Sequence, residues 1–273
     1  MEKVNLGLIG YPVSHSKSDR YHNDFLSDLG LSERYGKFSV KPEQLNDFLL
    51  EAKQNAMRGL SVTMPLKECI IPLLDEVDEA AKSIGAVNTV KFINGKTFGY
   101  NTDAQGALEA IKHRYPHPLT DKKAIIVGAG GVAKAIAWVL AKAGMHIVIA
   151  NRSMEKAVTL AKALNAQVCS LDALGSLLET QCDFLIQATS LGMVDQEMII
   201  DPSFIPSHVV VFDVVPAPNN GWLEKLSQKG CLTISGKVFW IFQAIEQYKI
   251  WYDEKLDLSS AFSIFQKSIE QKG

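Results

Sequence analysis

The sequence has little cysteine, and its four cysteines share no motif. Cys69, Cys169, Cys182 and Cys231 are scattered along 273 residues without C-x-x-C spacing or a companion histidine pattern. This distribution argues against a zinc site and against a disulfide framework, and it indicates free or buried thiols in a reducing compartment. We therefore expect no bound metal and a cytoplasmic protein.

An excess of one charge and long apolar runs are also lacking. The chain carries 28 basic and 30 acidic residues, for a formal net charge of −2. This balance favours neither nucleic acid nor an anionic membrane surface as a partner. Lysine or glycine interrupts each apolar stretch before the roughly 18 residues that a membrane helix needs. The first residues lead directly into a strand, without the apolar core of a signal peptide. These absences leave a soluble globular enzyme that acts on a small molecule.

The most informative stretch is a strand, a helix and a second strand over residues 122–153. A β-branched strand at 124–127 runs into four residues with three glycines, an apolar helix continues to Gly144, and the second strand spans 146–150. This is one βαβ unit of about 30 residues, the length typical of dinucleotide binding. A bare structural turn would explain the glycines alone but not the complete unit.

The spacing of small residues in this unit fits the needs of a bound pyrophosphate. Gly128 can make the tight turn out of the strand, and Gly130 has no Cβ to keep a phosphate from the helix N-terminus. Ala133 occupies the third fingerprint position, where a small residue lets the helix pack closely on the strand. The sequence thus predicts a nucleotide site after the first strand.

The end of the second strand favours NADP over NAD. NAD sites usually carry Asp or Glu there to bond the ribose 2′-hydroxyl, but this chain reads Asn151-Arg152-Ser153, with Lys156 one turn further on. A guanidinium can grip a 2′-phosphate through two hydrogen bonds, and a serine can donate to it. The alternative is that Ser153 only caps the next helix and Arg152 is a solvated charge.

Strands and helices alternate on both sides of this unit, which predicts an α/β protein with a mostly parallel sheet. A chain of this length favours two domains, and the proline-containing loop at 115–118 resembles a hinge. Strands are expected at 4–9, 35–40, 59–63, 86–90, 96–100, 184–188, 209–215 and 232–235. Helices are expected from residue 18 through 29 and at 42–55, 80–85, 104–114, 154–164, 171–179, 222–228 and from 237 to the end.

Three polar segments follow strands of the first half. They are the loop 13–18 with its three serines, Lys67 at a strand-to-helix corner, and Asn101-Thr102-Asp103 before a helix. Taken alone, the first and third are typical helix N-caps and the lysine is typical of a solvated charge. The other interpretation is a set of donors at the carboxyl edge of a sheet, suited to a polyol or a carboxylate.

Together, these segments resemble the shikimate dehydrogenase family over nearly the whole chain and in the family's order. The matching motifs are Gly10-Tyr-Pro-Val-Ser-His-Ser-Lys-Ser18 with His22-Asn23, Val62-Thr-Met-Pro-Leu-Lys67, Gly85-Ala-Val-Asn-Thr89 and Asn101-Thr-Asp103 with Gly106. Several motifs in register are far more specific than any one of them. The resemblance overrides the structural interpretation of the three polar segments.

The resemblance also implies roles for individual residues. Lys67 and Asp103 would form the catalytic pair, and Ser16 and Ser18 would hold the carboxylate of shikimate. The residues expected to bond the ring hydroxyls are Thr63, Asn88 and Gln243. Those expected to hold NADP are Gly128, Ala129, Gly130, Gly131, Val132, Ala133, Asn151, Arg152, Ser153, Lys156, Thr189, Ser190 and Gly236.

The implied reaction is the reversible reduction of 3-dehydroshikimate by NADPH, in aromatic amino acid and chorismate biosynthesis. The implied architecture has a substrate domain over 1–103, a Rossmann-type NADP domain over 104–236, and helices over 237–273 that return to the first domain. The sequence does not fix the oligomeric state, and a homodimer is one arrangement that it allows.

The chain departs from the family pattern at six places, one of them three residues long, and these departures leave two alternatives open. The departures are Asp19 for proline, Ser61 for asparagine, Lys134 for arginine, Gln187 for asparagine, Pro216 for tyrosine, and Val238-Phe239-Trp240 for Gly-Met-Leu. One alternative is a quinate or dual quinate/shikimate dehydrogenase that uses NAD. The other is a weakly active paralogue that binds a nucleotide.

Overall fold

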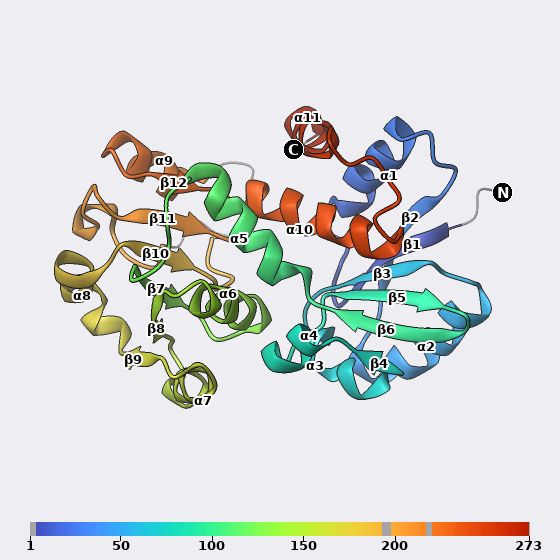
Figure 1. The fold of residues 1–273 in the computed structure, drawn as a ribbon, viewed down its shortest axis with the longest axis horizontal. Helices are drawn as coiled ribbons and strands as arrows, with labels where there is room; N and C mark the ends of the chain where they lie inside the picture. The colour runs from blue at the N-terminus through green and yellow to red at the C-terminus, as the bar shows by residue number, and fades with distance from the viewer. Residues whose placement is uncertain (1–3, 193–197, 217–219, 273) are drawn as a thin grey trace. The chain divides into compact units, whose positions relative to one another are not determined.

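A computed structural model describes residues 4–192, 198–216 and 220–272, and Figure 1 shows its helices and strands. The chain divides into two compact units. One unit runs to Thr102 and resumes at Gln243, and the other spans Asp103–Phe242. Two helices cross these boundaries without a break, α5 (Thr102–Arg114) and α10 (Gly236–Trp251). The substrate and nucleotide roles of the two units stay predictions at this point.

The first unit contains a six-stranded mixed sheet in the order β2-β1-β3-β5-β6-β4. Its strands are β1 (Val4–Gly10), β2 (Arg34–Ser39), β3 (Gly59–Val62), β4 (Glu76–Val77), β5 (Thr89–Ile93) and β6 (Lys96–Tyr100). Strand β1 runs parallel to β2 and β3, and β4 runs parallel to β6. Strand β5 is antiparallel to both of its neighbours. The strand expected at 86–90 lies instead at Thr89–Ile93.

The helices of the first unit bury apolar stripes against this sheet. Leu45, Leu49 and Ala52 of α2 lie in one core cluster with Leu60 of β3, as their helical spacing requires. On another part of the unit, the ring of Phe25 in α1 stacks on that of Phe265 in α11 at 4.2 Å. The helices are α1 (Ser18–Asp28), α2 (Leu45–Gln54), α3 (Leu66–Cys69), α4 (Glu79–Ile84) and α11 (Ala261–Lys272).

The second unit contains a six-stranded parallel sheet in the order β12-β11-β10-β7-β8-β9. Its strands are β7 (Lys123–Val127), β8 (His146–Ala150), β9 (Gln167–Cys169), β10 (Phe184–Gln187), β11 (Val210–Asp213) and β12 (Thr233–Ile234). Its other helices are α6 (Gly131–Lys142), α7 (Met154–Leu164), α8 (Leu174–Gln181) and α9 (Gly221–Gln228). Counted within the unit, the strand order is 3-2-1-4-5-6, the Rossmann order, with its switch point between β7 and β10. The predicted α/β fold with mostly parallel sheets is confirmed.

The expected continuous C-terminal helix is wrong between residues 252 and 260. Helix α10 ends at Trp251, and Asp253 and Glu254 both adopt positive φ, which no helix accommodates. The expected helix at 171–179 also differs, because its first turn is a 3₁₀ helix. The 3₁₀ helices are η1 (Pro42–Gln44), η2 (Ile71–Leu73), η3 (Leu171–Ala173) and η4 (Pro202–Phe204).

All four cysteines are free thiols, as expected, with Cys69 exposed and Cys182 and Cys231 buried. Among the described ranges, no helix combines the length and the apolar character that a membrane span requires.

Candidate active site

The polar segments of the first unit meet at one edge of its sheet. Strands β1 and β3 are parallel, with Ile9 beside Val62, so the chain leaves both strands at the same edge. Strand β5 is antiparallel to β3 and β6, so its start, at Thr89, lies beside Ser61 and beside Tyr100. The strand register thus brings the serine loop, Thr63, Asn88 and the start of α5 to a common edge.

Backbone hydrogen bonds tie the loops at this edge together. The amide of Tyr11 donates to Met64 O at 3.0 Å, and the amide of Thr63 donates to Ile9 O at 2.9 Å. Gly10 must be glycine, because a Cβ there would lie 2.4 Å from Thr63 Cγ2. The serine loop and the Thr63 segment are therefore one packed structure.

Ser16 and Ser18 form a close pair of half-buried hydroxyls. Their oxygens are 2.6 Å apart, and the amide of Ser18 donates to Ser16 Oγ at 3.2 Å. Lys37 of β2 holds the loop from the side, because its Nζ donates to Ser16 O at 2.7 Å and pairs with Asp19 at 3.1 Å. The departure at Asp19 thus has a physical role, as it binds a lysine that places the serine pair.

Asn88 is buried, with 2 % exposure, and it holds the start of α5. Its Oδ1 accepts from the amide of Thr102 at 2.7 Å and from Thr89 Oγ1 at 2.8 Å, and its Nδ2 donates to Thr102 Oγ1 at 2.9 Å. Asp103 follows in the first turn of α5 and is 3 % exposed. Asn88 therefore fixes the segment that carries the predicted catalytic acid.

Lys67 lies in the short helix α3, directly after the Thr63 segment. Its carbonyl accepts from the amide of Val87 at 2.8 Å, and its side chain is partly buried. Val87 adjoins Asn88, which binds Thr102. The main chain of Lys67 and the residue before Asp103 are therefore held by two consecutive residues, 87 and 88.

Gln243 begins the part of α10 that belongs to the first unit, and it is partly buried. One turn later, Gln247 hydrogen-bonds to the Asn88 carbonyl at 3.3 Å and accepts from Ser61 at 2.9 Å. Residues four apart on a helix share a face. Gln243 therefore lies on the face of α10 whose next turn contacts the site edge.

The glycine turn of the second unit follows β7 at the switch point of the sheet. Gly128 has φ of +127°, and a Cβ there would lie 2.7 Å from Ala188 O, so two independent constraints require glycine. Gly130 is exposed, and a Cβ on it would meet no protein atom within 4 Å. The space above Gly130 and the N-terminus of α6 is therefore open to a ligand phosphate.

The ends of three neighbouring strands place further predicted cofactor residues at this edge. Val127 pairs with Ala150 and with Gln187, so Asn151 and Ala188 begin beside Gly128. Asn151 Nδ2 donates to Ser153 O at 2.9 Å, which folds the turn after β8. The remaining residues of that turn are Arg152, which is exposed, and Ser153, which occupies the N-cap position of α7 without a capping hydrogen bond.

Thr189 and Ser190 follow β10 and are ordered by Gln187. Gln187 Oε1 accepts from Thr189 N at 2.6 Å and from Thr189 Oγ1 at 2.8 Å, and its Nε2 donates to Leu191 O at 2.9 Å. The departure from asparagine at Gln187 therefore preserves an amide that shapes this loop. Gly236 has a packing role as well, because a Cβ there would lie 2.3 Å from the carbonyl carbon of Val215.

The residues of the second unit fit NADP. The turn at Gly128–Gly130 is open to a pyrophosphate, and the turn after β8 offers Arg152 and, in the first turns of α7, the exposed Lys156 rather than a carboxylate. Cations at this position suit a 2′-phosphate. Among the described residues, no cluster of histidine, cysteine and acidic side chains could hold a metal ion.

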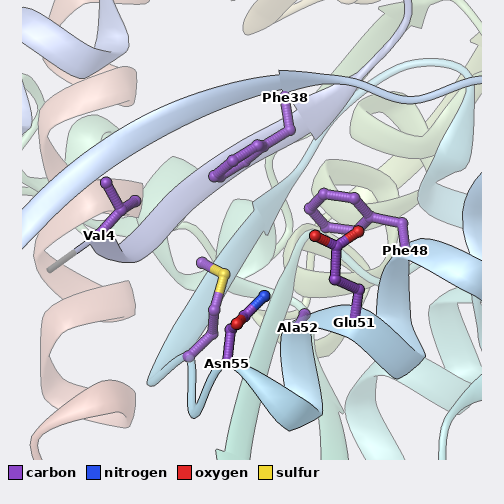
Figure 2. A pocket seen from close by; sticks show the side chains of 7 residues that line it. Val4, Phe38, Phe48, Glu51, Ala52 and Asn55 are labelled. Atoms are coloured by element: carbon purple, nitrogen blue, oxygen red, sulfur yellow. The ribbon is translucent and has the colours of Figure 1, made fainter.

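One cavity in the first unit lies apart from all these residues. Figure 2 shows it, and its volume is about 270 Å³. It is lined by Val4, Phe38, Phe48, Glu51, Ala52, Asn55 and Met57. None of these was predicted to bind substrate or cofactor, and the Phe38 and Phe48 rings pack against each other at 5.2 Å. We assign the cavity no part in the reaction.

Comparison with known proteins covers both units. Residues 8–90 match the family model described as the shikimate dehydrogenase substrate binding domain, and residues 109–214 match the model described as shikimate / quinate 5-dehydrogenase. A shikimate dehydrogenase (NADP(+)) of Aquifex aeolicus is 38% identical over 90% of both chains.

Two solved structures extend the likeness to the fold. A shikimate dehydrogenase in complex with NADP+ is 36% identical, covers 98% of this chain and 94% of its own, and superposes with a TM-score of 0.90. The enzyme of Thermus thermophilus, in complex with NADP(H) and shikimate, is 30% identical, covers 97% of this chain and 99% of its own, and has a TM-score of 0.86.

The fold and these matches define an NADP-dependent oxidoreductase that acts on a CH–OH group. Two family models match most of the chain, and a relative is 38% identical over nine-tenths of it. The chain belongs to the shikimate dehydrogenase family.

Several residues that shape the site carry no functional signal in the sequence. Lys37, Tyr35 and Gln247 read as ordinary strand and helix residues. The pattern of the chain carries no signal for them, because their partners lie 21 or more positions away.

Proposed function

We propose that this protein catalyses the NADPH-dependent, reversible reduction of 3-dehydroshikimate to shikimate. The observation that carries the proposal is the strand register of the first unit. It gathers Ser16, Ser18, Thr63 and Asn88 at one sheet edge, with Asp103 directly after the bound Thr102. A substrate with one carboxylate and several hydroxyls needs such a set of short donors.

Substrate binding is assigned to the serine pair and to three further polar side chains. Ser16 and Ser18 would donate to the carboxylate, because their hydroxyls lie side by side and can point both hydrogens outward once the 2.6 Å bond between them opens. Thr63, Asn88 and Gln243 would bond the ring hydroxyls. Such bonds hold the ring in one orientation for attack on the carbonyl carbon.

Proton transfer is assigned to Lys67, with Asp103 as its partner. The carbonyl oxygen gains negative charge during reduction, and an ammonium within hydrogen-bond distance stabilises that charge and then supplies the proton. A carboxylate that accepts a charged hydrogen bond from the ammonium would orient it. The hydrogen bonds from Val87 to Lys67 and from Thr102 to Asn88 support this pairing.

The cofactor supplies the hydride when it is bound. The pyrophosphate would lie at the N-terminus of α6, where backbone N–H groups favour an anion. The residues proposed to receive it are Gly128, Ala129, Gly130, Gly131, Val132 and Ala133. The adenosine 2′-phosphate would be held by Asn151, Arg152, Ser153 and Lys156. The nicotinamide side would be lined by Thr189, Ser190 and Gly236.

The reaction would take place in the cytoplasm, which agrees with four free thiols. A homodimer stays a prediction, which light scattering after gel filtration would test.

The direct test is an absorbance assay at 340 nm with shikimate and NADP+, repeated with quinate and with NAD+. We expect the highest kcat/KM for shikimate with NADP+. Higher kcat/KM for quinate with NAD+ would instead identify a quinate dehydrogenase. Absence of turnover with shikimate and either cofactor would refute the proposed function and favour a nucleotide-binding paralogue.

A separate variant tests the preference for NADP+ over NAD+. Arg152→Leu is expected to reduce kcat/KM for NADP+ by roughly 10- to 100-fold, the loss of one charged, bidentate contact, and to leave kcat/KM for NAD+ unchanged. Lys162→Leu changes an exposed lysine near the other end of α7 and is the matched control. An equal effect of Arg152→Leu on both cofactors would contradict the assignment.

A further inference from the structure

A chain of buried hydrogen bonds runs beneath the substrate edge of the first unit. Tyr35 donates to Ser61 Oγ at 2.7 Å, and Ser61 donates to Gln247 Oε1 at 2.9 Å. Gln247 Nε2 donates to Thr89 Oγ1 at 3.1 Å, and Thr89 donates to Asn88 Oδ1 at 2.8 Å. All five residues are at most 7 % exposed, and each residue of the series donates a hydrogen bond to the next.

Gln247 is the centre of this chain. Its Oε1 accepts from Ser61, and its Nε2 donates both to Thr89 and, at 3.3 Å, to the Asn88 carbonyl. A reversed amide would place its oxygen against that carbonyl, so only one orientation satisfies all partners. A buried amide costs more to desolvate than an apolar side chain of the same size. When fully bonded, however, such a network defines a single geometry.

The partners of Gln247 adjoin three predicted substrate residues. Ser61 lies two residues before Thr63, the Asn88 carbonyl is bonded directly, and Gln243 lies one helical turn earlier on α10. A change in the position of Gln247 therefore moves β3, the start of β5 and α10 relative to one another.

We propose that Gln247 is a positioning residue, which sets the relative placement of Thr63, Asn88 and Gln243 for the substrate ring. This inference rests on the proposed function, because it assigns those three residues to substrate. It also gives Ser61 a role, since its hydroxyl accepts from Tyr35 and donates to Gln247. The substrate contacts are thereby made dependent on a residue that does not contact the substrate.

The test compares Gln247→Met with Tyr248→Phe. Methionine has a similar length to glutamine and forms none of the three hydrogen bonds. We expect the KM for shikimate to rise about 10-fold or more, the effect of losing two or more net hydrogen bonds. The KM for NADP+ should stay within about twofold, because its predicted residues lie in the other unit.

Tyr248→Phe is the matched control for loss of a buried polar group. Tyr248 is fully buried on the same helix and bonds to His22 at 3.1 Å, outside the chain of hydrogen bonds. The Tyr248→Phe variant should have a lower Tm and an unchanged KM for shikimate. If Gln247→Met also lowers Tm but leaves both KM values unchanged, Gln247 is purely structural and the inference is overturned.

A second comparison asks whether Gln247 acts through Asn88. In an Asn88→Ala background, Gln247→Met should change kcat/KM by a smaller factor than in the wild type, because one of the three side chains that it positions is gone. Equal factors in both backgrounds would contradict the inference. If Gln247→Met does not fold, Ser61→Ala removes one bond of the same glutamine and should raise the KM for shikimate about fivefold.

The same assays separate the inference from the function on which it rests. Wild-type enzyme without shikimate turnover would refute the proposed function, and the role of Gln247 with it. Wild-type turnover with unchanged kinetics in Gln247→Met and Ser61→Ala would refute the role of Gln247 alone.

Discussion

Lys67 is the residue on which the proposed chemistry most depends. Lys67→Ala removes the proposed proton donor but none of the predicted substrate donors. We expect kcat to fall by roughly 100- to 10,000-fold, the usual contribution of general acid catalysis. The Kd of shikimate, measured by calorimetry, should stay within about threefold, because binding and chemistry use different groups.

A control for this variant exists in the same unit. Lys82→Ala changes a lysine of α4 whose side chain is 55% exposed, and it should leave kcat unchanged. Normal kcat in Lys67→Ala would remove Lys67 from the chemistry, whatever the effect on KM.

His22 makes stability depend on pH. It is buried among Tyr35, Tyr248 and Phe265, and burial lowers its pKa from 6.5 to about 3. In the unfolded chain the imidazole gains a proton below pH 6.5, whereas in the folded protein it stays neutral down to about pH 3. The contribution of His22 to stability is therefore present above pH 6.5 and is lost as the pH falls from 6.5 towards 3.

Urea unfolding between about pH 5 and pH 8 measures this effect. Below pH 6.5, His22 should lower the free energy of unfolding by up to about 1.4 kcal/mol for each pH unit. His22→Phe should lose this part of the slope. Tyr248→Phe keeps the histidine and should retain it. Identical slopes in wild type and His22→Phe would show that His22 is not buried in the neutral form.

At the scale of elements, alanine substitutions at Gly128 and Gly130, which follow β7, are expected to have opposite effects on stability and on NADPH binding. Gly130→Ala places a methyl group where no protein atom lies within 4 Å, at an ordinary φ of −83°. Its Tm should fall by no more than about 4 °C, because alanine in place of glycine at this N-cap position costs at most about 1 kcal/mol. The Kd of NADPH, from fluorescence titration, should rise roughly 10-fold or more, because a methyl group would meet the pyrophosphate.

Gly128→Ala provides the comparison. Its methyl group would clash with Ala188 O, and its φ of +127° disfavours any side chain. Tm should fall by several degrees, for a strain of about 1–3 kcal/mol. If both variants lost stability equally and bound NADPH normally, the glycines would form only a structural turn.

Much of the fold could be predicted because its signals are local. The glycine turn and the alternation of strands and helices each depend on residues that lie close together in the sequence. The break after Trp251 could not be predicted in this way. Residues 252–260 have no glycine or proline to end a helix, and Asp253 instead bonds to Lys91, 162 positions away.

The candidate site shows the same difference between local signals and long-range partners. Serines, a lysine and an aspartate in motifs are visible in the sequence, whereas the residues that hold them are not. Gln247 looks like any polar helix residue until Ser61, Thr89 and Asn88 are seen around it. Long-range partners decide such roles, and one sequence does not reveal them.

At the scale of the whole molecule, each unit carries half of the predicted machinery. The first holds the polar edge with Ser16, Ser18, Thr63 and Asn88, and the second holds the glycine turn. Reduction of a ketone requires that hydride donor and carbonyl carbon meet. The proposed reaction therefore needs both a substrate bound by the first unit and a cofactor bound by the second, with Lys67 as the proposed proton donor to the reacting oxygen.

A crystal structure with shikimate and NADP+ tests this claim most directly. It should show the shikimate carboxylate on the hydroxyls of Ser16 and Ser18, and Lys67 Nζ within about 3 Å of the hydroxyl that is oxidised, with Asp103 as its partner. Shikimate bound elsewhere, or Lys67 and Asp103 on separate surfaces away from the nicotinamide, would contradict the account.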